Sequence, residues 1–196
     1  MTNFYTLDGP KSPWGDYSHI LIAGMSEHLN GDGGLLQLWR AGPYVPPISF
    51  PGIQDIVVTE TFRKDLEASG LAGIRFQPVI KKHIVNLDWH LWDKSRNKPP
   101  EYPKDGEPEG YLLDRPHCPE TSEQVGDLWE VVLEVSAKIY RDPHRPFPPH
   151  LVKSSVRGGD LFRAEDVGYN YVTEKAKKWF EQHAAEHIRF KEVKTT

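Results

Sequence analysis

The segment His83–Asp93, HIVNLDWHLWD, holds the side chains whose types and spacing come nearest to chemistry. In an extended chain Asp88 and His90 share one face, because residues two apart point the same way. They could then provide two ligands to a metal ion, or serve a hydrolase together with His83. A metal site needs three or four ligands whose orientation is fixed by further hydrogen bonds. We therefore predict neither a metal nor a cofactor, and keep the hydrolase as the less favoured interpretation.

The motifs of common catalytic sites are missing from the sequence. There is no GxSxG nucleophile turn, no glycine-rich phosphate loop with Lys-Ser or Lys-Thr, and no GxGxxG after a strand. His183 and His187 are spaced i, i+4 but lack the HExxH pattern, and His117 and Cys118 have no second pair to complete a zinc site. No nucleic-acid-binding motif is present. We therefore expect a binding protein and not an enzyme.

Aromatic and acidic residues in proline-rich loops are the better candidates for function. Between Pro99 and Glu130, nine acidic residues are opposed only by Lys104 and Arg115. This segment is either a solvated loop or a docking surface for a basic partner. The aromatic residues either cap the core or, on stiff loops rimmed by acids, form a protein–protein interface. The predicted partner-binding residues are Trp14, Tyr17, Trp89, Trp92, Glu101, Tyr102, Asp105, Glu107, Glu109, Tyr111 and Asp114.

Length and composition favour a single globular domain. The chain has 196 residues, a net charge of -4 and 38% hydrophobic residues, so neither nucleic acid nor a membrane is expected as a partner. No apolar run approaches the roughly 20 residues of a spanning helix. The N-terminal segment has no basic and apolar signal pattern, and the single Cys118 cannot form an internal disulfide. We expect a cytoplasmic protein.

Two similar segments suggest the elements that position the loops. VTETFRKDLEASGLAGIRFQPV (58–79) and VTEKAKKWFEQHAAEHIRFKEV (172–193) align without a gap at an offset of 114 residues. In each, a strand leads to a threonine suited to a helix N-cap, followed by an amphipathic helix and a second strand. This predicts two strand–helix–strand units related by an internal repeat. The shared pairs are Val58/Val172, Thr59/Thr173, Glu60/Glu174, Lys64/Lys178, Glu67/Glu181, Ile74/Ile188, Arg75/Arg189, Phe76/Phe190 and Val79/Val193.

The remaining elements point to an α+β fold with mixed or antiparallel sheets. Leu35–Gly42 reads as a strand, and Pro78–Asp93 as one or two short strands. Asp127–Asp142 fits a helix and a strand equally well by spacing, and its β-branched residues favour a strand. We predict one domain over residues 1–196, with related halves (about 1–98 and 128–196) joined by an acidic, proline-rich segment, 99–127.

The segments that carry the repeat also resemble bacterial polymorphic-toxin immunity proteins. The shared features are a strand, a Ser/Thr-Glu helix start, a GL-G-F helix exit, and a G-LFR phrase formed here by Gly159, Leu161, Phe162 and Arg163. The resemblance covers roughly residues 35–93 and 150–196, and leaves out the acidic middle. Some relatives carry two CxxCG pairs that suggest a metal, but the single Cys118 does not transfer that feature.

The resemblance implies an antidote that binds a cognate toxin one-to-one and blocks it. Such toxins are often delivered by type VI or contact-dependent secretion in competition between bacteria, and many are nucleases with basic clefts. The acidic segment would suit such a cleft. An adaptor or chaperone that delivers an effector is the alternative from another class. Whether the partner is inactive or active within the complex distinguishes the two.

Overall fold

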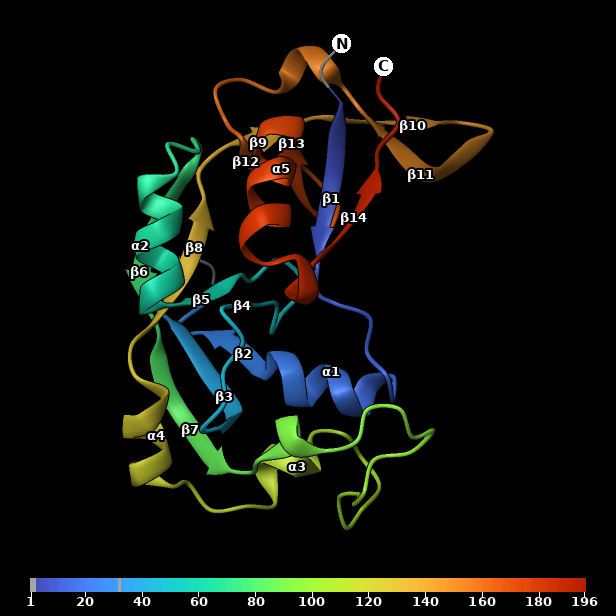
Figure 1. Cartoon of the computed structure of the whole chain (residues 1–196). Coiled ribbons are helices and arrows are strands. Elements are labelled where there is room, and N and C mark those ends of the chain that lie inside the picture. Colours follow the sequence, from blue (N-terminus) through green and yellow to red (C-terminus); the bar gives the residue numbers. More distant parts are fainter. Residues whose placement is uncertain (1–2, 32) are drawn as a thin grey trace.

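Four β-sheets organise the chain in this computed structural model, which describes residues 3–31 and 33–196 and only the backbone of Arg145. The elements form two stacked lobes, and both termini lie at the far end of the upper lobe (Figure 1). The sheets include both mixed and purely antiparallel ones, so the α+β class with mixed or antiparallel sheets is confirmed.

The upper lobe is built on the five-stranded sheet. Its strands, in the order β14–β1–β13–β12–β9, are β14 (Arg189–Glu192), β1 (Phe4–Asp8), β13 (Asn170–Thr173), β12 (Leu161–Ala164) and β9 (Ser136–Ala137). Helix α5 (Glu174–His183) packs against this sheet. The hairpin of β10 (Ile139–Asp142) and β11 (Arg145–Leu151) projects from the lobe as an arm (Figure 1). Two 3-10 turns complete the lobe, η2 (Lys153–Ser155) and η3 (Ala185–His187).

An antiparallel four-stranded sheet lies between the lobes. Its strands, in the order β4–β5–β8–β6, are β4 (Ile48–Ser49), β5 (Val57–Thr59), β8 (Leu128–Leu133) and β6 (Ile74–Pro78). Helix α2 (Glu60–Ala68) packs against it. The ambiguous segment from Asp127 is thus a strand where β8 forms. Its β-branched side chains suit a position between two paired neighbours.

The lower lobe is built on a three-stranded sheet with short helices around it. The strands, in the order β2–β3–β7, are β2 (Met25–His28), β3 (Leu36–Gly42) and β7 (Ile80–Asn86). The helices are α1 (Asp16–Ala23), the 3-10 turn η1 (Trp89–Leu91), α3 (Gly110–Leu113) and α4 (Pro119–Val125). The predicted strand at Leu35–Gly42 is confirmed as β3, and Pro78–Asp93 contains β7. None of the helices among the described residues is long and apolar enough to cross a bilayer.

Both segments singled out by their similarity fold as strand, helix and strand. Thr59 caps α2 by accepting a hydrogen bond from the Phe62 N–H group (3.4 Å), and Thr173 caps α5 in the same way from Ala176 (3.3 Å). Each hydroxyl satisfies a backbone donor that has no partner within its helix. Phe62 and Leu66 on α2 and Ala176 and Phe180 on α5 form the buried stripes.

One hydrophobic core joins the two helices and their sheets. The Phe62 ring lies 5.5 Å from the Trp179 ring and 6.3 Å from the Phe180 ring, measured between centroids, so α2 and α5 pack together. Leu7 of β1 and Val131 of β8 belong to the same core. Because it draws on both ends of the chain, its formation requires contacts between residues far apart in sequence.

The sheets exchange strands between the two predicted halves. β1 comes from the N-terminal segment but pairs with β13 and β14, whereas β8 follows residue 127 but pairs with β5 and β6. The segment 99–127 is also part of the lower lobe. The Cys118 N–H group donates to the Ile84 carbonyl (2.7 Å), and Lys81 donates to the carbonyls of Ser122 and Gly126. This segment therefore packs on β7 as well as joining the flanking elements.

Candidate functional site

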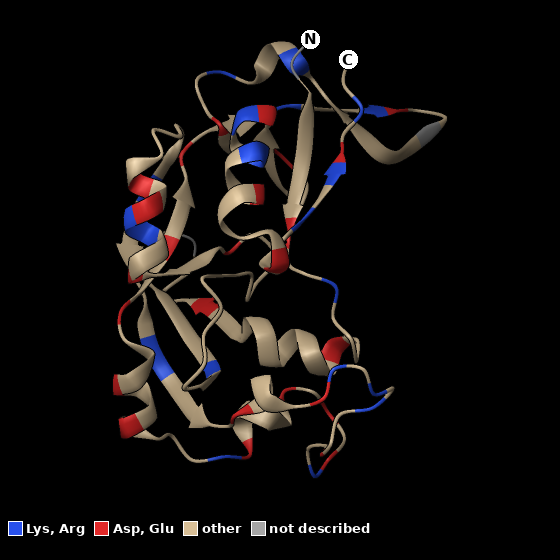
Figure 2. Ribbon diagram, in the orientation of Figure 1, with Lys and Arg blue, Asp and Glu red and all other residues tan. Residues whose placement is uncertain are grey.

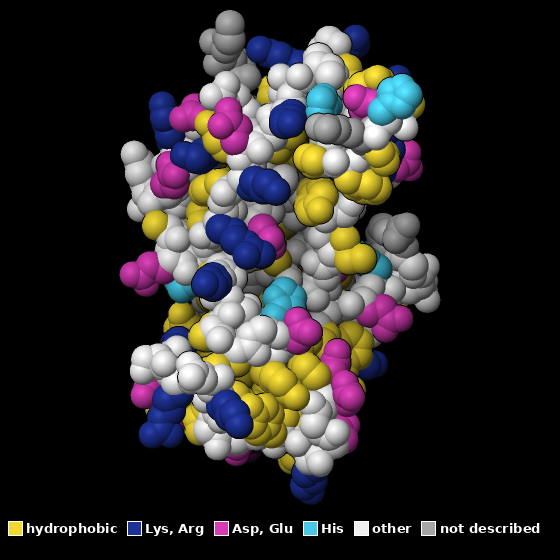
Figure 3. Space-filling model, turned by 90° about the vertical axis from the view of Figure 1, so that its right-hand side faces the viewer, with side chains coloured by type: hydrophobic (Ala, Val, Ile, Leu, Met, Phe, Trp, Pro, Cys, Tyr) yellow, Lys and Arg dark blue, Asp and Glu magenta, His cyan; other side chains and the backbone are white. Residues whose placement is uncertain are grey.

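The acidic segment presents its carboxylates to solvent on the lower lobe. Acidic residues lie along α4 and in the neighbouring loops (Figure 2). On the side face of the molecule, acidic side chains gather along one edge of the lower lobe, while basic side chains run through the upper lobe (Figure 3). The exposed acids of the predicted interface are Glu101, Asp105, Glu107, Glu109 and Asp114. The two lobes thus differ in the charge they offer a partner.

Among the described residues, one of these five acids makes an ion pair. The Glu101 carboxylate accepts from the Arg115 guanidinium at 2.7 Å. Asp105 instead accepts from the backbone N–H group of Glu107 (3.0 Å), which fixes the turn but leaves its charge unbalanced. Glu109 and Asp114 have no ion pair among the described residues. These carboxylates are available to charged groups of a partner at little desolvation cost.

Hydrogen bonds from two tyrosines hold the acidic loops in place. The Tyr111 hydroxyl donates to the Glu101 carbonyl (2.6 Å), and the Tyr17 hydroxyl donates to the Gly106 carbonyl (2.6 Å). Tyr111 is fully buried, and burial raises the pKa of its hydroxyl to about 12. The hydroxyl therefore remains a donor at any physiological pH. Together with the prolines, these contacts stiffen a surface that would otherwise lose entropy on binding.

Three of the aromatic residues expected at an interface lie in the core instead. Trp14, Trp89 and Tyr111 are buried in the hydrophobic cluster of the lower lobe, where the Trp14 ring lies 6.0 Å from that of Trp92. The loops that carry them fold over one another, which sequence spacing does not reveal. Of the six predicted aromatic residues, Tyr17 and Trp92 are half-buried, and Tyr102 is the exposed one.

The residues of the hydrolase interpretation do not converge. β7 ends at Asn86 and a 3-10 turn covers Trp89–Leu91, so Asp88 and His90 do not share the face of a strand. His83 Nε2 contacts the Arg115 carbonyl (2.9 Å), and the His90 ring stacks on Tyr44 at 4.7 Å. Each ring thus has a local structural role, and the geometry gives no support to joint catalysis.

A cluster of three polar side chains, which sequence reasoning missed, lies where the lower lobe meets the four-stranded sheet. His28 of β2, Asp55 of the loop before β5, and Glu130 of β8 each bring one ligand-type atom within 4.8 Å of the others. They line a cleft of about 870 Å³. The one signal in the sequence is Glu130 itself, which shares one face of a strand with the apolar Leu128 and Val132. Nothing in the sequence connects it to positions 28 and 55.

Comparison with known proteins does not assign the chain to a family. No protein-family model matches the chain. Likewise, the search of curated proteins finds no match.

Proposed function

We propose that this chain is a cytoplasmic immunity protein, which binds a secreted antibacterial toxin one-to-one and neutralises it. The proposal starts from the resemblance of residues 35–93 and 150–196 to immunity proteins. The observation that carries it is the exposed acidic segment, held in a fixed conformation by Tyr111 and Tyr17. A rigid inhibitor loses less entropy on binding. An antidote also needs no catalytic residues.

The charge of the segment favours a toxin with a basic surface. Four of the five exposed acids have no ion pair among the described residues, so their field is not cancelled locally. Such a surface speeds encounter with a cationic cleft and discriminates against acidic partners. Toxins that act on nucleic acids have basic clefts because their substrates are polyanions. A nuclease delivered by type VI or contact-dependent secretion is the partner that this surface suits best.

We also propose that the two strand–helix–strand units are copies of one duplicated segment. The pairing registers support this. Val58 lies opposite Trp129 of β8, and the corresponding Val172 lies opposite Tyr5 of β1. The strands on the other edges of β8 and β1 correspond as well. Arg75 of β6 lies opposite Val132 of β8, and the corresponding Arg189 of β14 lies opposite Asp8 of β1. The duplicated units form the scaffold, and the loops inserted between them carry specificity.

The test is calorimetry of the chain with the toxin encoded by the neighbouring gene, followed by the toxin's activity in the complex. We expect one-to-one binding with the activity abolished. Replacing Glu101 and Glu107 and Glu109 by Gln, and Asp105 by Asn, should weaken binding by about tenfold or more and flatten its salt dependence. The matched control removes four exposed acids elsewhere: Glu165→Gln, Asp166→Asn, Glu186→Gln and Glu192→Gln.

Three outcomes would contradict the proposal. Tight binding with the toxin still active would identify an adaptor. Absence of binding would show that this chain is not the antidote of that toxin. Equal losses in the two quadruple variants would assign the effect to net charge and not to the acidic segment.

A further inference from the structure

The cleft between β2, β8 and the loop before β5 contains two carboxylates close to one imidazole. His28 Nε2 lies 3.1 Å from Glu130 Oε1. One ligand-type atom from each of His28, Asp55 and Glu130 lies within 4.8 Å of the other two. The Glu130 side chain is only 8% exposed, and that of His28 is 23% exposed. Two carboxylates this close, one of them buried, repel each other unless a positive charge lies between them.

Hydrogen bonds already orient both carboxylates. The Ser26 hydroxyl donates to Asp55 Oδ2 (2.6 Å), and Gln77 Nε2 donates to Glu130 Oε2 (2.6 Å). Each contact fixes one carboxylate oxygen, as supporting hydrogen bonds do at metal sites. The other Glu130 oxygen contacts His28, which is a proposed ligand of the same ion. Gly52 keeps room for this arrangement, since a Cβ there would approach Asp55 Oδ2 to 2.3 Å.

A buried amide in the same cleft supplies an independent observation. Asn170 of β13 is 4% exposed and lines the cleft, and its Oδ1 has no hydrogen-bond donor among the described residues. A buried carbonyl oxygen without a donor costs free energy unless something else satisfies it. The wall of the cleft therefore holds a buried polar atom whose hydrogen-bonding capacity is unused among the described residues.

The positive groups of the cleft are partly committed elsewhere. Arg75 donates to Gln77 Oε1 (3.0 Å) and pairs with the exposed Glu134 at 3.7 Å. Arg163 also lines the cleft, as an exposed side chain of β12. Neither guanidinium contacts Asp55 or Glu130 among the contacts of the described residues. Among the contacts of the described residues, the His28 imidazole is thus the one basic group that touches either carboxylate.

We infer that His28, Asp55 and Glu130 bind a divalent transition-metal cation, with Zn²⁺ as the first candidate. One imidazole with two carboxylates suits Zn²⁺, which accepts nitrogen and oxygen ligands at about 2.0–2.2 Å. Around such an ion, ligand atoms lie about 3.4 Å apart, so small side-chain rotations close the present spacing. The cation would clamp β2 of the lower lobe to the central strand β8. This role is independent of toxin binding.

The test is metal binding by tag-free protein, because a histidine tag would bind the same ions. Elemental analysis by mass spectrometry and calorimetry with ZnCl₂, MnCl₂ and MgCl₂ measure stoichiometry and affinity. We expect one Zn²⁺ per chain, weaker Mn²⁺ binding, and a Zn²⁺-dependent rise in Tm. His28→Gln and Asp55→Asn change partly exposed residues, so they should fold, and each should weaken Zn²⁺ binding by tenfold or more.

The matched controls are His19→Gln and Asp16→Asn, which change an exposed histidine and an acid outside the cleft. Glu130→Gln is a third variant, checked first for a native circular dichroism spectrum because the residue is buried. The inference is overturned if Zn²⁺ shows no saturable binding, or if His28→Gln and Asp55→Asn bind Zn²⁺ as tightly as the controls do.

Discussion

The unit built on α2 and the unit built on α5 make the same contacts with different residues. The Arg63 guanidinium lies over Trp129, 4.7 Å from the ring centroid, and also faces Phe76. At the corresponding place in the second unit, the Lys177 ammonium lies 5.1 Å from the ring of Tyr5 and also faces Phe190. A cation between the helix and two aromatic side chains of the sheet thus recurs at equivalent positions.

Backbone contacts at the edges of the two units correspond as well. The Val79 N–H group donates to the Leu128 carbonyl, and Val193 donates to Phe4, both at 3.0 Å. The similarity therefore includes the central strands β8 and β1, whose sequences are not part of the aligned segments. Agreement in strand register is harder to reach by chance than agreement in a helix cap, because a slip by one residue reverses the face of every side chain.

The units differ most on the sheet face turned away from the helices. In the first unit, Glu130 lies opposite Gln77, and both line the cleft that β2 and the loop before β5 complete. In the second, the equivalent pair is Thr6 and Lys191, which line a pocket together with Pro148 and Pro149 of β11. The same scaffold thus places two different surfaces at one position. The correspondence between the units is thus closer on the face that packs on the helices.

The largest expected effect tests whether both helices contribute equally to the shared core. Phe180→Ala should lower the free energy of unfolding by about 3–5 kcal/mol, and Leu66→Ala by about 2–4 kcal/mol, because both side chains are buried and leave cavities. Phe180 should cost more, since it also contacts the Phe62 ring. Urea denaturation measures both values. Phe147→Ala is the control, because this ring is 72% exposed and its loss should stay within about 0.5 kcal/mol.

A loss below about 1 kcal/mol for either core variant would mean that its unit does not share the cooperative core. Two separate unfolding transitions would show the same. Equal losses of unfolding free energy at Leu66 and Phe180 would show that the contact between aromatic rings adds little stability beyond the burial of apolar area.

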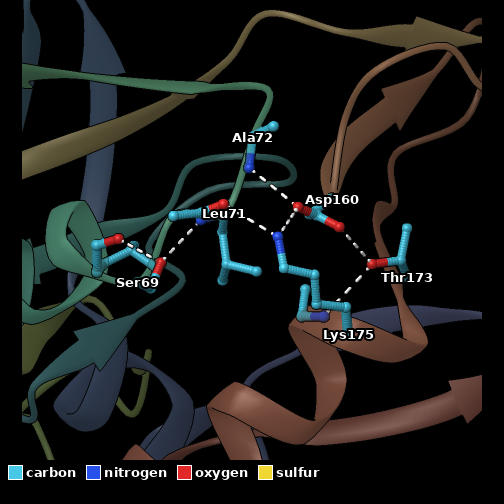
Figure 4. A network of polar contacts seen from close by, with 9 residues as sticks. Ser69, Leu71, Ala72, Asp160, Thr173 and Lys175 are labelled. Carbon is cyan, nitrogen blue, oxygen red and sulfur yellow. Dashed lines mark hydrogen bonds and ion pairs between the residues drawn. The ribbon is translucent and has the colours of Figure 1, made fainter.

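An intermediate effect is expected at Asp160, where the second unit has a polar network that the first lacks. Asp160 joins the loop after α2 to the start of α5 (Figure 4). Its carboxylate accepts from the Ala72 N–H group (3.1 Å), the Thr173 hydroxyl (2.9 Å) and Lys175 (2.9 Å). The Thr173 N–H group donates to the Asp160 carbonyl, and in the first unit the Thr59 N–H group donates to the Pro47 carbonyl. The proline side chain has no polar atom, so it cannot make such contacts. Asp160→Asn should lower the free energy of unfolding by about 1–2 kcal/mol at neutral pH.

The effect of this variant should depend on pH. Burial raises the pKa of the Asp160 carboxyl group, but hydrogen bonds from Lys175, the Ala72 N–H group and Thr173 outweigh burial and hold the pKa below its ordinary value. A depressed carboxyl pKa contributes stability above the unfolded pKa of about 3.9. That contribution is lost as the pH falls through the folded pKa. The difference between wild type and Asp160→Asn should therefore shrink below about pH 4, while the exposed control Asp65→Asn shows no such difference. A constant difference would contradict the network.

Local features of the fold were predictable from the sequence, whereas its long-range pairings were not. The threonine caps and apolar stripes of α2 and α5 follow from residues within one helical turn of each other. The assignment of β1 and β8 to central positions depends on pairing between distant segments, which no local pattern specifies. The burial of Trp14 and Trp89 has the same cause, because it requires the loops of the lower lobe to close over them.

The candidate sites divide in the same way. The acidic segment was visible because its charge lies in one run of sequence, and the structure leaves its carboxylates from Glu101 to Asp127 exposed. His28, Asp55 and Glu130 come from three separate segments, and only the packing of β2 against the central sheet brings them together. Sequence alone could mark a glutamate on an apolar strand face as unusual, but not name its partners.

The two helix caps give the most direct comparison of the units, and Thr59→Ala has the smallest expected effect. Thr59→Ala should cost about 0.5–1 kcal/mol, the usual value for losing a side-chain cap. Thr173→Ala should cost about 1–2 kcal/mol, because this hydroxyl accepts from Ala176 and also donates to Asp160. Serine at either position keeps the hydroxyl and should restore most of the loss, measured by urea denaturation.

The double variants test whether Asp160 causes the difference between the caps. In the Asp160→Asn background, the free-energy cost of Thr173→Ala should fall toward that of Thr59→Ala, since the amide is a weaker acceptor than the carboxylate. Equal costs in the wild-type background would show that the network adds nothing to the cap, and that the two units are energetically alike at this position.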